Sequence, residues 1–113
     1  MATNDEVTND NLGDKVFEAA QSSFGVKFSL VRQYLRSESE KLAITLRMII
    51  EGAATGEITK AEAKILLNQQ KIATSAVLTA AEGMTSVAVQ SAINAGLKVV
   101  KDFVNGKLGF ALL

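Results

Sequence analysis

The stretch from Thr59 to Asn105 constrains the fold more than any other part of this sequence, because it reads as one long and nearly unbroken helix. Its central part, Ile72 to Leu97, has 26 residues and a single charged side chain, Glu82. Most of its other residues are Ala, Ser, Thr, Gly or Val, and the whole chain lacks proline, the strongest helix breaker. A helix with so few charges must be covered by its own chain, by further copies of the protein or by lipid.

Small side chains recur at every fourth position along this predicted helix. A row of this kind lets a second helix approach closely, because nothing larger than a methyl group separates the two backbones. In lipid the same spacing drives association between helices. We therefore predict a helix–helix association surface, with one larger residue interrupting the row, made of Ala76, Ala80, Met84, Ala88, Ala92 and Gly96.

A second helix is predicted from about Val26 to Ala54. A turn near residues 54–59 joins it to the long helix that begins at Thr59. Thr59 and Glu62 have the spacing of a capping box, in which each side chain accepts a backbone N–H of the other residue. Because the connection is short, the two helices are expected to be antiparallel neighbours, as in a helical hairpin. Apolar side chains at helical spacing predict the seam between them, namely Leu35, Leu42, Leu46, Ile49, Ile65 and Ile72.

The N-terminal part divides into an arm and a short helix. Residues 1–10 are polar, acidic and without periodicity, so we interpret them as a flexible arm. Asn11 or Asp14 can cap a helix that continues through Ser23. Residues 11–113 are then a single helical domain, a size typical of one folding unit.

Helix lengths leave two architectures open. At about 1.5 Å per residue, Val26–Ala54 spans roughly 43 Å and Thr59–Asn105 roughly 70 Å. In the favoured architecture the long helix is straight and forms an extended hairpin with the helix over Val26–Ala54. The part of the long helix that extends beyond this partner is covered by the N-terminal helix and by other chains, in a multi-chain, coiled-coil-like bundle. In the alternative, Gly25 and Gly83 are turns and the chain folds into a compact four-helix bundle. The hairpin is favoured because one interior glycine costs only about 1 kcal/mol relative to alanine, and we identify no cap after Gly83.

Missing residue types exclude several kinds of chemistry. Without cysteine or histidine the chain has no thiol nucleophile, no imidazole base and no zinc site of a common type. We find no glycine-rich phosphate loop and no metal-spaced set of carboxylates. We therefore expect no enzymatic activity, no catalytic residues, no metal and no cofactor. A net charge of zero gives no reason to expect a nucleic-acid partner.

Glu82 is the one candidate for a functional side chain, since it is the only charge in the central part of the long helix. A carboxylate covered by protein or lipid would respond to pH and could act as a switch. The alternative, and the commoner situation, is a glutamate on a solvent-exposed face of the helix.

The sequence does not identify a cellular location. The N-terminus is acidic and polar, unlike a secretory signal, so we expect soluble synthesis in the cytoplasm. Polar residues dilute residues 72–97 too far for a convincing transmembrane span, but export or membrane association by a signal-independent route stays open.

Three functions are consistent with these features. The favoured one is a structural or adaptor protein that forms homo-oligomers through its helices, alone or with other protein subunits, as in a secretion apparatus or a virion. The second is a membrane-active protein that inserts the low-charge helix 72–97. The third is a small monomeric helical module that binds or inhibits a partner. The first two predict association with other chains or with lipid, whereas the third predicts a compact monomer.

Overall fold

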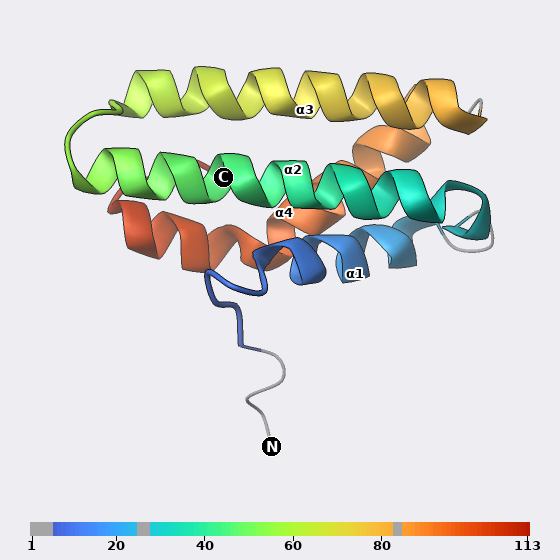
Figure 1. Cartoon of the computed structure of the whole chain (residues 1–113), viewed down its shortest axis with the longest axis horizontal. Helices are drawn as coiled ribbons and strands as arrows, with labels where there is room; N and C mark the ends of the chain where they lie inside the picture. Colours follow the sequence, from blue (N-terminus) through green and yellow to red (C-terminus); the bar gives the residue numbers. More distant parts are fainter. Residues whose placement is uncertain (1–5, 25–27, 83–84) are drawn as a thin grey trace.

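The computed structural model describes residues 6–24, 28–82 and 85–113, and within these ranges the chain is helical with no strand. The helices are α1 (Leu12–Phe24), α2 (Phe28–Ala54), α3 (Lys60–Glu82) and α4 (Ser86–Leu108) (Figure 1). The predicted all-α class is therefore confirmed.

The turn between α2 and α3 has the predicted position and the predicted cap. The backbone N–H of Thr59 donates to Glu62 Oε1 (2.8 Å), and the N–H of Glu62 donates to Thr59 Oγ1 (3.1 Å). Before it, Gly56 adopts a left-handed conformation (φ +79°), and the N–H of Glu57 donates to the carbonyl of Gly52 (2.8 Å). This pairing is a Schellman motif, which satisfies the last carbonyl groups of α2 and reverses the chain.

The prediction of one continuous helix from Thr59 to Asn105 is wrong. The structure has two helices of 23 residues each in this stretch, and α4 runs back in the opposite direction to α3 (Figure 1). Thr85 is extended (φ −71°, ψ 151°), and its side-chain oxygen accepts the N–H of Ala88 (3.2 Å), so it is the N-cap of α4. A straight helix of roughly 70 Å would also exceed the longest dimension of the molecule, which is 41 Å.

The compact four-helix alternative therefore describes the fold better than the extended hairpin. The turns predicted at Gly25 and Gly83 fall on residues outside the described ranges. On either side of them, α1 ends at Phe24 and α2 begins at Phe28, while α3 ends at Glu82 and α4 begins at Ser86.

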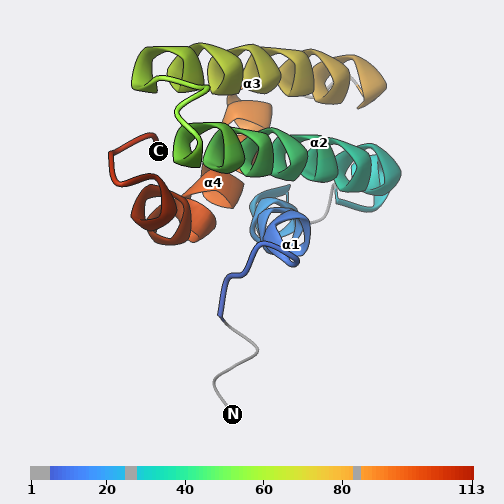
Figure 2. The same cartoon turned by 60° about the vertical axis from the view of Figure 1, so that its left-hand side comes forward.

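The four helices form a flat molecule measuring 41 × 37 × 18 Å along its principal axes. The central helix is α2, with α3 along one side of it and α1 along the other (Figures 1 and 2). Helix α4 packs mainly on α1 and contacts α2 and α3 less extensively. Consequently α3 has a neighbour along its full length on one side only, and that neighbour is α2.

Reversal of the chain buries the apolar face of α4. Its large buried side chains recur at helical spacing and lie against those of α1 and α2 in one core; they are Val89, Ile93, Leu97, Val100 and Val104. In a continuous helix most of these side chains would stay in water. At roughly 1.5–3 kcal/mol for each fully buried Val, Ile or Leu side chain, their burial outweighs the cost of breaking the helix after α3.

Close packing of α1 on α4 depends on a glycine. A Cβ atom built on Gly96 would lie 2.8 Å from Val16 Cγ1 and 2.9 Å from the backbone oxygen of Val16. Such distances are shorter than any van der Waals contact, so the two backbones approach as closely as they do because Gly96 has no side chain. The neighbouring Ala92 is also fully buried.

Helix α4 ends three residues later than the sequence suggested. Gly106 is helical, and Gly109 takes the left-handed conformation (φ +79°) and donates its N–H to the carbonyl of Asn105 (2.9 Å). The side chain of Asn105 then holds the following segment, because its Oδ1 accepts the N–H groups of Leu112 (2.8 Å) and Leu113 (3.1 Å). This apolar tail packs partly against the core.

Two glycine-to-alanine substitutions on α4 test the close packing with α1. Gly96→Ala is expected to lower the free energy of unfolding by about 1–3 kcal/mol, because the added methyl group meets the backbone of Val16. Gly106→Ala is the matched control, since a Cβ there meets nothing within 4 Å; it should raise stability by up to about 1 kcal/mol. Urea denaturation measures both values, and equal effects of the two substitutions would contradict the packing.

Candidate association surface

The predicted row of small residues is divided between two helices that face different surroundings. On α4, Ala92 and Gly96 are buried and Ala88 is half-buried, so this half of the row packs inside the molecule. The helix that approaches Gly96 closely is α1 of the same chain. On α3, by contrast, Ala76 and Ala80 are exposed, and Met84 lies outside the described residues.

The α2 positions of the predicted hairpin seam are buried, whereas its two α3 positions face solvent. Leu35, Leu42, Leu46 and Ile49 are all buried in the core, whereas Ile65 is 57% exposed and Ile72 is 62% exposed. Among residues 60–80 of α3, those buried against the rest of the molecule are Ala63, Leu67, Thr74 and Leu78.

The error on α3 has a simple geometric cause. Ile65 lies two positions after the buried Ala63, and Ile72 lies two positions before the buried Thr74. A step of two residues turns the side-chain direction by about 200° around a helix. Both isoleucines therefore point away from α2. Two stripes at helical spacing run along α3, and the one made of Ala63, Leu67, Thr74 and Leu78 is the buried one.

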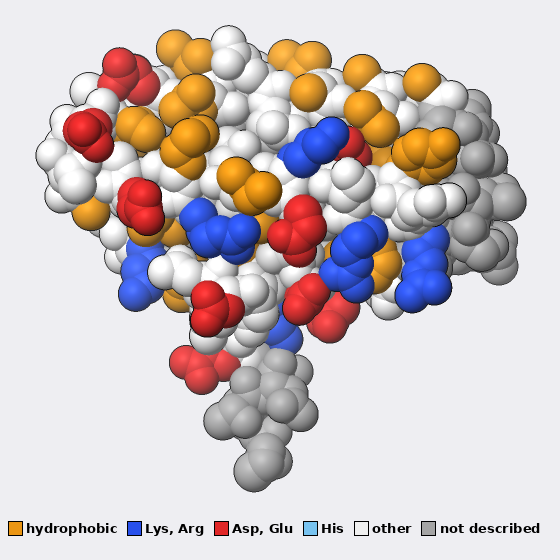
Figure 3. Space-filling view, viewed as in Figure 1, with side chains coloured by type: hydrophobic (Ala, Val, Ile, Leu, Met, Phe, Trp, Pro, Cys, Tyr) orange, Lys and Arg blue, Asp and Glu red, His pale blue; other side chains and the backbone are white. Residues whose placement is uncertain are grey.

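The outward face of α3 is apolar and carries no charge over most of its length. Six exposed side chains form its centre, namely Ala61, Ile65, Gln69, Ile72, Ala76 and Ala80, and the exposed Glu62, Asn68 and Ala73 lie at its margins. Between Ile65 and Ala80 the chain has one charged residue, Lys71, which is half-buried and faces α4. In Figure 3 hydrophobic side chains follow the top edge of the molecule over α3, while most charged side chains gather lower, over α2 and α1. A solvated helix face normally carries charges, so this outer face of α3 is unusual.

The spacing on the outer face of α3 is symmetric. Its six central residues lie at equal distances on either side of the midpoint between Gln70 and Lys71. If two copies of α3 pair in antiparallel orientation about that midpoint, Ile65 meets Ala76 of the other copy, Gln69 meets Ile72 and Ala61 meets Ala80. Each larger side chain then lies opposite a smaller or flexible one, which is the complementarity that close helix packing requires.

Glu82, the candidate switch, is the last residue of α3, but its side chain lies outside the described residues. The structure instead reveals a buried carboxylate that the sequence analysis did not identify as such. The side chain of Glu38 on α2 is 3% exposed. Its Oε2 accepts a hydrogen bond from Lys41 Nζ (2.9 Å), and its Oε1 has no hydrogen-bond partner among the described residues. Glu38 lies within the apolar seam of α2, and this position in the sequence was the signal that its carboxylate would be buried.

Other features relevant to chemistry are few. The described ranges contain no group of three or more His, Cys, Asp or Glu residues that could hold a metal ion. Within the same ranges, no helix is both long enough and apolar enough to cross a membrane. Residues 72–97, predicted as one low-charge helix, are divided between α3 and α4.

Comparisons with known proteins supply no relative for this chain. It matches no protein-family model, no curated protein and no solved structure.

Substitutions in the Glu38–Lys41 pair test the consequence of the buried carboxylate. Lys41→Met leaves Glu38 without its cation and is expected to lower the free energy of unfolding by about 1–3 kcal/mol. Glu38→Met removes the buried charge altogether and should be neutral or stabilising, because burying a charge costs free energy that a methionine does not. Chemical denaturation at neutral pH compares the two variants. If Glu38→Met destabilises the protein more than Lys41→Met does, the carboxylate has a role that this pair does not explain.

Proposed function

We propose that this protein is a non-enzymatic structural or adaptor protein whose molecules associate in pairs through the outer faces of α3. The observation that carries the proposal is the exposed, charge-free stripe that includes Ile65, Ile72 and Ala76. Contiguous apolar surface of this kind marks interaction sites on soluble proteins.

A second copy of the same chain suits this face better than an unrelated partner. A pair related by a two-fold axis uses the same patch on both molecules, so the patch must complement itself. The symmetric spacing on α3 meets that condition, because Ile65 and Ala76 exchange places across the axis. Antiparallel pairing also sets the positive N-terminal end of each α3 beside the negative C-terminal end of the other.

The expected association is modest in strength. Ile65 and Ile72 are each more than half exposed, and covering the four isoleucines of a pair contributes roughly 1 kcal/mol apiece. That sum only matches the lower end of the cost of joining two molecules, which is about 4–15 kcal/mol. Close packing over Ala76 and Ala80 must add to it. We therefore expect a dimer that forms at roughly micromolar or higher concentration rather than an obligate one.

Sedimentation equilibrium over a series of protein concentrations tests the proposal. The wild-type chain should change from the monomer mass of 12.0 kDa towards twice that mass as concentration rises. Ile72→Glu should remain monomeric, because the symmetry sets two added carboxylates close to the two-fold axis. Its stability should change by less than about 0.5 kcal/mol, since the residue is on the surface.

Val87→Glu is the matched control for this experiment. Val87 is the most exposed large apolar side chain among the described residues, at 76%, but it lies on α4 and outside the proposed surface. This variant should dimerise like the wild-type protein. A wild-type chain that stays monomeric at all concentrations, or a Val87→Glu variant that dissociates as much as Ile72→Glu, would contradict the proposal.

A further inference from the structure

A groove lies between α3, α4 and the segment that follows α4, on a different side of α3 from the outer face. Its volume is about 340 Å³, at the lower end of the range of small-molecule sites, which is about 300–1,000 Å³. Apolar side chains contributed by all three parts line it, namely Leu67, Leu97, Leu112 and Leu113.

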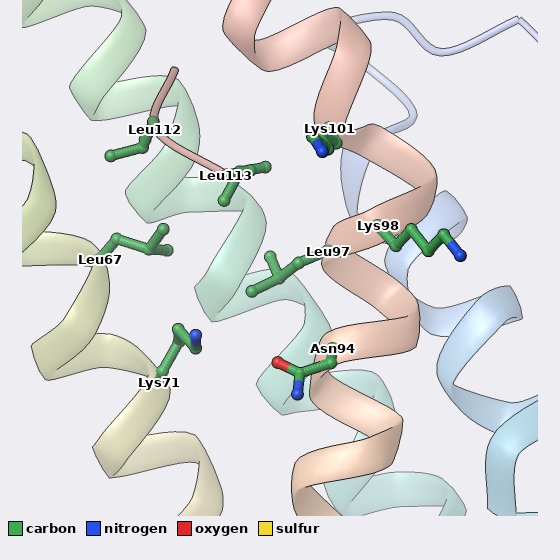
Figure 4. A pocket seen from close by; sticks show the side chains of 8 residues that line it. All are labelled: Leu67, Lys71, Asn94, Leu97, Lys98, Lys101, Leu112 and Leu113. Carbon is green, nitrogen blue, oxygen red and sulfur yellow. The ribbon is translucent and has the colours of Figure 1, made fainter.

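The groove has one polar end and one apolar end. Figure 4 shows Lys71 from α3 and Asn94 from α4 facing each other across the lower end, while the four leucines gather toward the upper end. An amine and a carboxamide can both donate hydrogen bonds. The site therefore offers donors at one end and an apolar surface at the other.

The charged side chains that line the groove are all positive. They are Lys71, Lys98 and Lys101, and the lining includes no aspartate or glutamate. Within the described part of the chain, none of the three amines forms an ion pair. The amine of Lys98 points away from the groove, toward α1 (Figure 4). Lys71, which is half-buried, is thus the cation best placed at the polar end.

One side of the groove is held in place by Asn105. Its side chain accepts the backbone N–H groups of Leu112 and Leu113 and donates to the carbonyl of Leu113 (3.3 Å). These three hydrogen bonds fold the segment back on the core. The apolar end is therefore a formed surface and not a loose tail, which lowers the ordering cost that a ligand would otherwise meet.

We propose that this groove binds an amphipathic anion with a single alkyl chain, of which a medium-chain fatty acid is the simplest example. The carboxylate lies between Lys71 and Asn94, and the alkyl chain lies along the half-buried Leu112 and Leu113 and the small exposed parts of Leu67 and Leu97. A helix of another protein, about 10–12 Å in diameter with its side chains, is too wide for a groove of this volume. The proposal is independent of dimerisation, because the groove does not include the outer face of α3.

An NMR titration of the ¹⁵N-labelled full chain with decanoate, kept below its critical micelle concentration, tests this site. Decanoate should shift the amide resonances of Leu97, Leu112 and Leu113 in a saturable way. The uncharged analogue decanol, at equal concentration, should bind at least about tenfold more weakly, because a hydrogen bond to a charged group is stronger than one to a neutral group.

Charge variants identify the residue that holds the carboxylate. Lys71→Met and Lys71→Glu should each weaken decanoate binding by about tenfold or more, and far-UV circular dichroism checks that both variants remain folded. Lys107→Glu makes the same charge change on α4 outside the groove, where the lysine amine lies 5.5 Å from the centre of the Phe103 ring, and should bind decanoate like wild type.

Four results would overturn the proposal. They are the absence of saturable shifts, equal binding of decanol and decanoate, unchanged affinity in both Lys71 variants, and decanoate shifts centred on Ile65 and Ile72 instead of the groove leucines.

Discussion

The contact between Val16 and Gly96 determines how the rest of this molecule is arranged. A glycine at this position lets the backbone of α4 lie against that of α1, and a methyl group in its place would collide with the Val16 carbonyl. Because α1 covers α4 in this way, the valines and leucines of α4 join a core shared with α2. The chain therefore gains more by reversing direction after α3 than by continuing as one long helix.

The same contact explains why α3 is left with an uncovered side. Helix α1 occupies one side of α2, and α4 packs chiefly on α1, so α3 packs mainly against α2 alone. Its inner stripe of Ala63, Leu67, Thr74 and Leu78 is satisfied within the molecule. Its outer stripe, with Ile65 and Ile72, faces water without the charges that normally keep a helix face solvated. The proposed association between copies rests on this exposed, charge-free stripe.

Local signals in the sequence predicted local structure well. The turn before Thr59 and its capping box were predictable because both depend on a few neighbouring residues, and the α2 seam was predictable from one strong apolar stripe. Two features of the fold were not predictable from such local signals. The break after α3 was not predictable from Gly83, because one glycine costs too little to end a helix, and α4 begins at the N-cap that Thr85 provides. On α3 two stripes of similar spacing compete, and their spacing alone does not decide that the stripe with Leu67 and Leu78 faces inward while the stripe with Ile65 and Ile72 faces outward.

The row of small residues shows where sequence reasoning stops. Its spacing indicated that another helix would come close, and on α4 the helix that does so is α1 of the same chain. On α3 the spacing is equally good, yet the described structure covers neither Ala76 nor Ala80. No pattern within the row distinguishes an intramolecular partner from a second copy, because both demand the same small side chains.

The central claim is that the α4 half of this row is used within one molecule and the α3 half between two. Isotope-filtered nuclear Overhauser measurements on a mixture of labelled and unlabelled protein test it most directly, because they report contacts between different copies. The account predicts contacts between copies from the Ile65 methyl groups to the Ala76 methyl group, and contacts between Val16 and Gly96 only within one copy. Contacts between copies at Ala92 or Gly96, or from Ile65 to its own counterpart, would contradict it.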